Sequence, residues 1–176
     1  MDYRLMVYDD FFAHPEKVRE KALEQKFDHV TTYFPGRRTD QCRNILPDLF
    51  NELETAVKPL IPANTIIETA VFQTQDESDY RKIHQDTYSV ISGVIYLDIE
   101  PIPNSGTGFY THIETGWDGS TPKPNSIEYI NDLDFERTTV IENKFNRMII
   151  YDGRALHSAE GAGDQRLTIM YRIYNK

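Results

Sequence analysis

Two histidines and one aspartate form the first pattern in the sequence that could carry chemistry. His84 and Asp86 are separated by one residue, so on an extended segment both side chains project to the same side. His157 lies far along the chain, between two apolar segments that are typical of strands. Two imidazoles and one carboxylate that leave one side of a metal open are the facial triad of non-haem Fe(II) sites, and Zn²⁺ is the competing metal.

The His-x-Asp pair alone is weak evidence for a metal site. With 15 aspartates among 176 residues, five histidines meet this spacing about 0.4 times by chance. A surface His–Asp pair is therefore the plain alternative, and a histidine without a ligand role is the alternative for His157. The evidence for a metal site becomes stronger only if further residues that could bind a ligand of the metal lie near these three.

A basic residue at the start of the last predicted strand could bind such a ligand. Arg166 follows His157 by nine residues and shares a strand side with Thr168. A guanidinium inside a barrel needs an anion and pairs best with a carboxylate, whereas a surface arginine is the alternative. The intervening turn at residues 160–164 predicts that the strands bearing His157 and Arg166 form a hairpin.

The elements that must position these residues are mostly strands. The N-terminal third predicts a strand at residues 5–8, a helix from Pro15 and a second helix from Pro47 to about Pro59. From Thr65 onward the apolar residues recur with period two, which predicts seven or eight short strands and a sandwich or barrel. These strands are expected at residues 65–73, 88–98, 107–113, 138–141, 147–151, 155–159 and 166–174.

The alternation within the strands predicts which side faces a ligand. In the last strand one side holds only apolar residues, and the other side is mixed: Leu167, Ile169, Tyr171 and Ile173 against Arg166, Thr168 and Met170. We expect the two amphipathic helices to cover the apolar sides. Polar groups inside a barrel are costly without partners, so the mixed sides predict a polar ligand site in the interior.

Six ordered segments together resemble the Fe(II)- and 2-oxoglutarate-dependent oxygenase superfamily, in its prolyl-4-hydroxylase-like branch with bacterial and phage relatives. They are His84-Gln85-Asp86, Gly93-Val94-Ile95-Tyr96-Leu97-Asp98, Ser105-Gly106-Thr107-Gly108-Phe109-Tyr110, Asn146-Arg147-Met148-Ile149-Ile150-Tyr151, His157 and Arg166-Leu167-Thr168. The resemblance implies a mainly β fold with N-terminal helices: a double-stranded β-helix (jelly roll, cupin-like) with helices packed on the major sheet. It implies one oxygenase domain over residues 1–176, with helical support in 1–62 and the β-helix core in 65–176.

The resemblance also implies the roles of individual residues. His84, Asp86 and His157 match the iron ligands, whereas Arg166, Thr168 and Tyr96 match the residues that bind the distal carboxylate of 2-oxoglutarate. The implied cofactors are Fe(II), 2-oxoglutarate and O₂, with ascorbate as a candidate reductant. The implied reaction hydroxylates a peptidyl or prolyl side chain or a small metabolite, and decarboxylates 2-oxoglutarate to succinate.

Two other classes of function stay open at this point. A jelly-roll binding or accessory structural module without catalysis would have no stoichiometric metal. A cupin-like zinc or iron hydrolase or isomerase would keep the metal without 2-oxoglutarate, which Arg166 with Thr168 disfavours. Neither the substrate nor the oligomeric state has a readable motif in the sequence.

Composition excludes several partners. The chain has 28 acidic and 19 basic residues, a net charge of −9, which argues against nucleic acid and against a polybasic membrane anchor. Apolar runs are too short to span a bilayer, the N-terminus lacks a signal-peptide pattern, and Cys42 is the only cysteine. These features predict a cytoplasmic protein.

Four further features have two interpretations each. The basic cluster of Arg37, Arg38 and Arg43 either faces an anionic substrate or is solvated. The segment 114–126 predicts a long loop, in which Trp117 either caps the substrate or anchors the loop. Tyr88 either lies near the iron or packs, and His112 either lines the barrel mouth or is a plain strand histidine.

Overall fold

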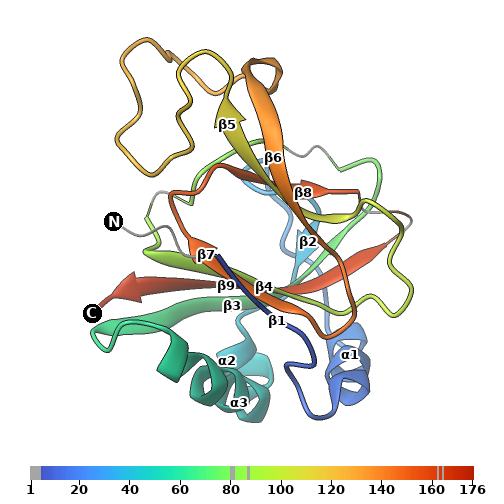
Figure 1. The fold of residues 1–176 in the computed structure, drawn as a ribbon. Coiled ribbons are helices and arrows are strands. Elements are labelled where there is room, and N and C mark those ends of the chain that lie inside the picture. The colour runs from blue at the N-terminus through green and yellow to red at the C-terminus, as the bar shows by residue number, and fades with distance from the viewer. Residues whose placement is uncertain (1–4, 80–81, 87, 162, 164) are drawn as a thin grey trace.

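Two antiparallel sheets that face each other form the body of the molecule (Figure 1). The computed structural model describes residues 5–79, 82–86, 88–161, 163 and 165–176. The large sheet has the order β1 (Leu5–Tyr8), β7 (Met148–Asp152), β4 (Ile91–Tyr96), β9 (Arg166–Asn175), β3 (Thr65–Gln75) and β2 (Arg37–Arg38). The small sheet has the order β6 (Phe135–Glu142), β5 (Gly106–His112) and β8 (His157–Glu160). The mainly β fold predicted from the alternation is confirmed.

Helices cover the large sheet on the side away from the small sheet (Figure 1). They are α1 (Pro15–Leu23), α2 (Cys42–Ile45), α3 (Pro47–Val57) and the 3₁₀ turn η1 (Lys58–Leu60). A second 3₁₀ turn, η2 (Asp132–Asp134), directly precedes β6 of the small sheet. Proline begins both α1 and α3, where its missing N–H costs nothing. The buried residues of α3 lie at helical spacing and join the core of the large sheet: Leu49, Phe50, Leu53 and Val57. None of the helices in the described ranges combines the length and apolar character needed to cross a membrane.

The central strand β9 separates core from cavity. Leu167, Ile169, Tyr171 and Ile173 belong to the core cluster shared with the helices. Arg166, Thr168, Met170 and Arg172 line a cavity between the sheets. The predicted division of β9 into an apolar side and a mixed side is therefore confirmed, because pleated backbone sends successive side chains to opposite faces.

The predicted hairpin between the strands of His157 and Arg166 is wrong. β8 pairs with β5 in the small sheet, whereas β9 lies between β3 and β4 in the large sheet. β8 and β9 therefore belong to different sheets. The physical reason is that β9 pairs with β3 along one edge and with β4 along the other, so neither edge is left for β8.

Two short elements, α2 and β2, were not predicted. β2 has two residues, and its register places Arg38 opposite Gln73 on β3. The turn before β2 requires glycine, because Gly36 has φ +73° and a Cβ there would lie 1.9 Å from the carbonyl oxygen of Thr74. This close approach fixes the position of Arg38 beside β3.

The long loop over residues 114–126 contains no helix or strand. Trp117 is buried and its Nε1 donates to the carbonyl oxygen of Thr121 at 2.9 Å. The indole also packs beside Phe135, with ring centroids 6.5 Å apart. Trp117 thus anchors the loop, and the cavity between the sheets is lined by other segments.

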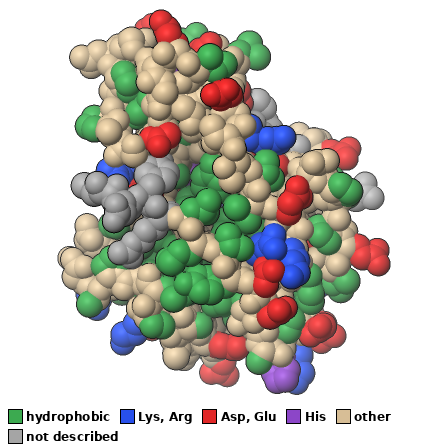
Figure 2. Space-filling model, in the orientation of Figure 1, with side chains coloured by type: hydrophobic (Ala, Val, Ile, Leu, Met, Phe, Trp, Pro, Cys, Tyr) green, Lys and Arg blue, Asp and Glu red, His purple; other side chains and the backbone are tan. Residues whose placement is uncertain are grey.

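The surface seen from the side of β1 is mixed. Figure 2 shows hydrophobic side chains gathered across the middle of this face, where β1 forms the edge of the large sheet, and acidic side chains around them. Leu5 and Val7 of β1 are 38% and 41% exposed.

Candidate active site

The backbone joins the His-x-Asp segment to the start of β8. His84 and His157 form an isolated antiparallel bridge, in which each N–H donates to the other's carbonyl oxygen at 3.0 Å. The N–H of Asp86 donates to the carbonyl oxygen of Gly153 at 2.7 Å. The three side chains are therefore brought together by main-chain pairing between segments far apart in the sequence.

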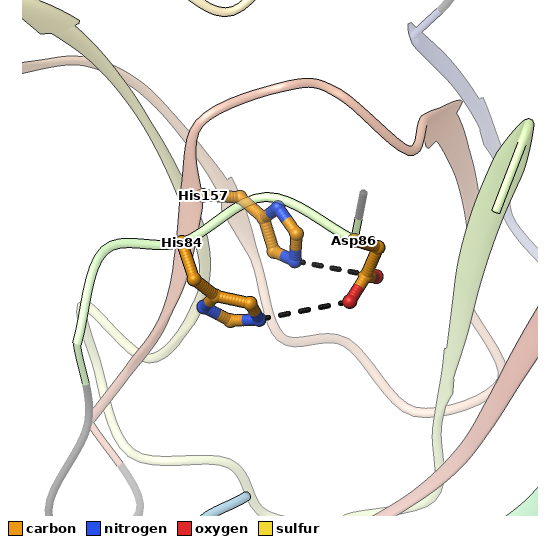
Figure 3. A group of neighbouring side chains, drawn as sticks. All are labelled: His84, Asp86 and His157. Atoms are coloured by element: carbon orange, nitrogen blue, oxygen red, sulfur yellow. Dashed lines mark ion pairs between the residues drawn. The ribbon is translucent and has the colours of Figure 1, made fainter. Parts of the chain in front are cut away.

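The three side chains point toward one another inside the cavity (Figure 3). One donor atom from each of His84, Asp86 and His157 lies within 4.8 Å of the others. The Nε2 atoms of His84 and His157 lie 3.9 and 3.7 Å from the two carboxylate oxygens of Asp86. Asp86 and His157 are buried, and His84 is half-buried.

The hydrogen bonds behind the rings test whether this group fits a metal ion. Nδ1 of His84 donates to the carbonyl oxygen of Lys82 at 2.9 Å, and Nδ1 of His157 donates to that of Ala155 at 2.8 Å. A carbonyl oxygen only accepts, so each Nδ1 carries the proton and each Nε2 presents a lone pair. Two lone pairs and a carboxylate then face one point, which is favourable only with a cation between them. The donor set is that of a facial-triad metal site.

The charge states of the site agree with that fit. Burial, followed by the neighbouring His84, lowers the pKa of His157 to about 4, so this ring is neutral at pH 7. Burial alone would raise the pKa of Asp86, yet His157 and Arg172 lower it overall. Arg172 donates to one carboxylate oxygen of Asp86, and Ser92 Oγ donates to the other at 2.6 Å. Asp86 is therefore an oriented carboxylate anion.

The predicted cosubstrate residues lie on the large sheet. Arg166 and Thr168 are 3% and 5% exposed and line the same cavity as the triad, which has a volume of about 420 Å³. The Arg166 guanidinium lies over the Tyr96 ring at 5.3 Å. The Tyr96 hydroxyl shares a hydrogen bond of 2.7 Å with Thr107, and it is Thr107 that lines the cavity. The direct contact between Tyr96 and a carboxylate stays a prediction.

Sequence reasoning missed several polar residues of the cavity, among them Arg172 and Gln73. Arg172 lies on the same side of β9 as Arg166, so the alternation could have found it. Gln73 occupies an inward position of β3, but its residue type carries no signal of its own. Ser92 on β4 holds the carboxylate of Asp86. Their contacts depend on strands that meet only in the folded protein.

Among the residues with open interpretations, Arg38 and Tyr88 line the cavity. Arg43 instead donates to the carbonyl oxygens of Ile67 and Glu68, both at 2.6 Å, which ties α2 to β3.

His112 is placed away from the cavity. Its Nδ1 bonds the Thr115 hydroxyl at 3.0 Å, and its ring packs on Phe135 with centroids 5.1 Å apart. His112 therefore supports the loop that follows β5.

Solved structures with the same architecture were found over nearly the whole chain. HygX from Streptomyces hygroscopicus, solved with nickel, 2-oxoglutarate and hygromycin B bound, has a TM-score of 0.67 at 11% identity, covering 98% of this chain and 83% of HygX. A Pseudomonas putida prolyl-4-hydroxylase has a TM-score of 0.56 at 14% identity, covering 99% and 94%. A Trichoplax adhaerens prolyl hydroxylase, solved with a peptide fragment of hypoxia inducible factor, has a TM-score of 0.62 at 11% identity, covering 97% and 83%.

At these identities the likeness shows the fold, and it confirms the predicted double-stranded β-helix of the 2-oxoglutarate oxygenases. No curated protein matches the chain. One family model matches residues 2–129 and 120–169, which together span most of the chain. The protein therefore belongs to the family of unknown function DUF6445.

Proposed function

We propose that the protein is an Fe(II)- and 2-oxoglutarate-dependent oxygenase that hydroxylates its substrate, with residues 1–176 acting as one domain. The observation that carries the proposal is the shared cavity: the triad of His84, Asp86 and His157 lies at one part of it, and Arg166 lies at another. A metal site alone would fit several reactions. A buried guanidinium in the same cavity favours a cosubstrate with a carboxylate.

Each residue of the triad has a defined task in this proposal. The Nε2 atoms of His84 and His157 and the carboxylate of Asp86 would hold Fe(II). When bound, the iron supplies oxygen activation coupled to decarboxylation of 2-oxoglutarate to succinate, with ascorbate as a candidate reductant. The protein orients the ligands: backbone carbonyls fix both rings, and Arg172 and Ser92 fix the carboxylate.

The cosubstrate task falls to β9. Arg166 would pair with the distal carboxylate of 2-oxoglutarate in a charge-assisted contact, and the Thr168 hydroxyl would donate to the same group. Both side chains are buried, so water competes little for these bonds. Val94, Tyr151 and Met170 line the same cavity and exclude water from it.

The substrate is either a peptidyl or prolyl side chain or a small metabolite. The solved structures with this fold include one with hygromycin B and one with a peptide fragment, so the fold accommodates both kinds. The fold does not decide between them.

The proposal is tested by binding and by turnover. Calorimetry should show one Ni(II) per chain and then saturable binding of 2-oxoglutarate, and the Fe(II) protein should release succinate in the presence of O₂. Arg166→Gln should weaken 2-oxoglutarate binding by about 2 kcal/mol, or about 30-fold, because it removes a charged hydrogen-bond donor from a buried contact. Arg37→Gln, at an exposed position outside the cavity, is the matched control.

The outcomes separate this function from its rival. A jelly-roll binding or structural module without catalysis would bind neither stoichiometric metal nor 2-oxoglutarate, and that result would overturn the proposal. Wild-type affinity for 2-oxoglutarate in Arg166→Gln would remove the assigned role of Arg166.

A further inference from the structure

The cavity has more positive charge than an iron ion and 2-oxoglutarate require. Among the described residues that line it, the buried or half-buried charged groups are three guanidiniums and one carboxylate: Arg38, Arg166, Arg172 and Asp86. A bound Fe(II) ion and a 2-oxoglutarate dianion would cancel each other's charge. Arg166 and Arg172 each make a further interaction, so the charge of Arg38 is the one that this ion and cosubstrate leave without a counter-charge, in a chain whose net charge is −9.

Two of the three arginines already have a task. Arg172 donates to Asp86, and Arg166 is assigned to 2-oxoglutarate by the proposed function. Arg38 forms no ion pair with any carboxylate of the described residues. Its contacts are a hydrogen bond from Nε to Gln73 Oε1 at 3.0 Å and the ring of Phe34, 3.6 Å from the guanidinium carbon. The N–H groups of its two terminal nitrogens stay available to a ligand.

The position of Arg38 is built from buried structure. Gln73 is 6% exposed, lies opposite Arg38 in the register of β2 and β3, and accepts the bond from Arg38. Its Nε2 donates to the carbonyl oxygen of Pro35 at 2.8 Å, which holds the preceding turn. The guanidinium is thus fixed at Nε and on one face, with its other end toward the cavity.

Holding Arg38 at this place has an electrostatic cost. Burial, followed by repulsion from Arg172, lowers the pKa of Arg38 to about 9. The lowered pKa means that the environment disfavours the positive charge of Arg38. The side chain nevertheless carries this charge at pH 7, because its pKa is still above 7. An anion in the cavity would relieve both causes of this cost.

The rim of the cavity near Arg38 is aromatic. Tyr33 and Tyr88 line the cavity, yet their side chains are 91% and 90% exposed. Exposed aromatic rings beside a cavity offer flat apolar surface to a ligand at its mouth. The two tyrosines come from different segments, one before β2 and one just after Asp86.

We propose that Arg38 binds an oxyanion of the substrate, so that the substrate is an organic acid whose apolar body lies against Tyr33 and Tyr88. The reaction of this acid rests on the proposed function. The binding of the acid by Arg38 does not. It narrows the substrate class from any peptide or metabolite to molecules with a carboxylate, or an equivalent oxyanion, near the reacting carbon.

The test uses wild-type protein loaded with Ni(II) and 2-oxoglutarate, titrated with matched acids and primary amides. The pairs are acetate and acetamide, phenylacetate and phenylacetamide, and N-acetyl-L-proline and its amide. The phenylacetate and N-acetyl-L-proline acids should bind at least about tenfold more tightly than their amides, because only the acids form a charge-assisted contact. Arg38→Gln should abolish this preference, Arg38→Lys should keep part of it, and Arg37→Gln should leave it unchanged.

Three results would overturn the inference and leave the proposed function standing. The acids and amides could bind alike, Arg38→Gln could keep the wild-type preference for acids, or none of the acids could show saturable binding. Thermal unfolding of Arg38→Gln shows whether the variant is folded. A loss of 2-oxoglutarate affinity as large as the loss of acid affinity would place Arg38 in the cosubstrate site and also overturn it. If the metal-loaded protein does not bind 2-oxoglutarate, the proposed function fails, and the same titrations without 2-oxoglutarate decide the role of Arg38.

Discussion

The floor and the mouth of the cavity are built differently. At the floor, Asp86, His157 and Arg166 are buried, and the side chains of the triad are held by backbone carbonyls or by other polar groups. At the mouth, Tyr33 and Tyr88 are exposed and lie outside regular helices and strands. Under the proposed function, the chemistry and the choice of substrate would therefore depend on separate parts of the molecule.

This division has a physical basis. Groups that take part in chemistry must keep their geometry within a fraction of an ångström, which strands with paired backbone provide. Of the proposed substrate contacts, Tyr33 and Tyr88 lie on connecting segments, where changes cost little stability, and Arg38 lies on the short strand β2. Floor variants should therefore alter metal and cosubstrate binding for every substrate, and mouth variants should alter only which ligands bind.

The largest expected effect is at the floor, in Asp86→Asn. The substitution removes the only negative ligand of the proposed metal site and leaves Arg172 without its ion pair. Affinity for Ni(II) or Fe(II) should fall at least about 100-fold, since even residues that merely orient ligands change affinity by 10–100-fold. Calorimetry measures the effect, and Asp48→Asn, at an exposed position of α3, is the control. Tight metal binding by Asp86→Asn would place the metal elsewhere.

The next effect concerns the pH dependence of the metal-free protein. His157 has a folded-state pKa of about 4, below the ordinary value of 6.5, so protons bind the unfolded state more tightly. Its contribution to stability is complete above pH 6.5 and is lost as the pH falls toward 4. The free energy of unfolding should decrease by up to about 1.4 kcal/mol per pH unit in this window. Urea unfolding at pH 7, 6 and 5 measures it, and His157→Gln should show a shallower slope; an equal slope would contradict the assignment.

A smaller floor effect is expected for Thr168→Val. The substitution keeps the side-chain volume and removes the hydroxyl that we assign to the distal carboxylate of 2-oxoglutarate. Affinity for 2-oxoglutarate should fall by about 1 kcal/mol, or about fivefold, with metal affinity unchanged. Thr139→Val on the exposed side of β6 is the matched control. An unchanged affinity would restrict the cosubstrate contact to Arg166.

The smallest effects should come from the mouth. Tyr33→Ala and Tyr88→Ala remove exposed rings, so the free energy of unfolding should change by no more than about 0.5 kcal/mol. Affinity for phenylacetate should fall a few-fold in both variants, whereas affinity for acetate and 2-oxoglutarate should stay constant. If either variant weakened 2-oxoglutarate binding, the division between floor and mouth would not hold.

Local periodicity predicted much of the fold and part of the site. The alternation in β9 predicted which of its sides meets the helices, because this property depends only on consecutive residues. The spacing of His84 and Asp86 predicted that both side chains reach one point. The neighbours of a strand depend on distant segments, so the assignment of β8 as a hairpin partner of β9 was wrong.

The position of Arg38 on β2 could not be predicted for a similar reason. β2 has two residues, and no repeating pattern can show in so short a strand. Its place depends on the turn at Gly36 and on the amide of Gln73, which is distant in the sequence. Arg38 could therefore be named as a member of a basic cluster, but its difference from Arg37 and Arg43 emerged only from the folded protein.

The unbroken course of β9 has a consequence for cosubstrate length. Arg166 begins this strand, and Arg172, which holds Asp86, lies six residues further along it. Extended backbone advances by about 3.3 Å per residue, so their Cα atoms are separated by roughly 20 Å. Since this separation is much longer than a five-carbon keto acid, the arginine side chains and the metal held by Asp86 would have to span the rest of the distance in the proposed site. A cosubstrate of another length would then be accommodated only as far as the Arg166 side chain can adjust.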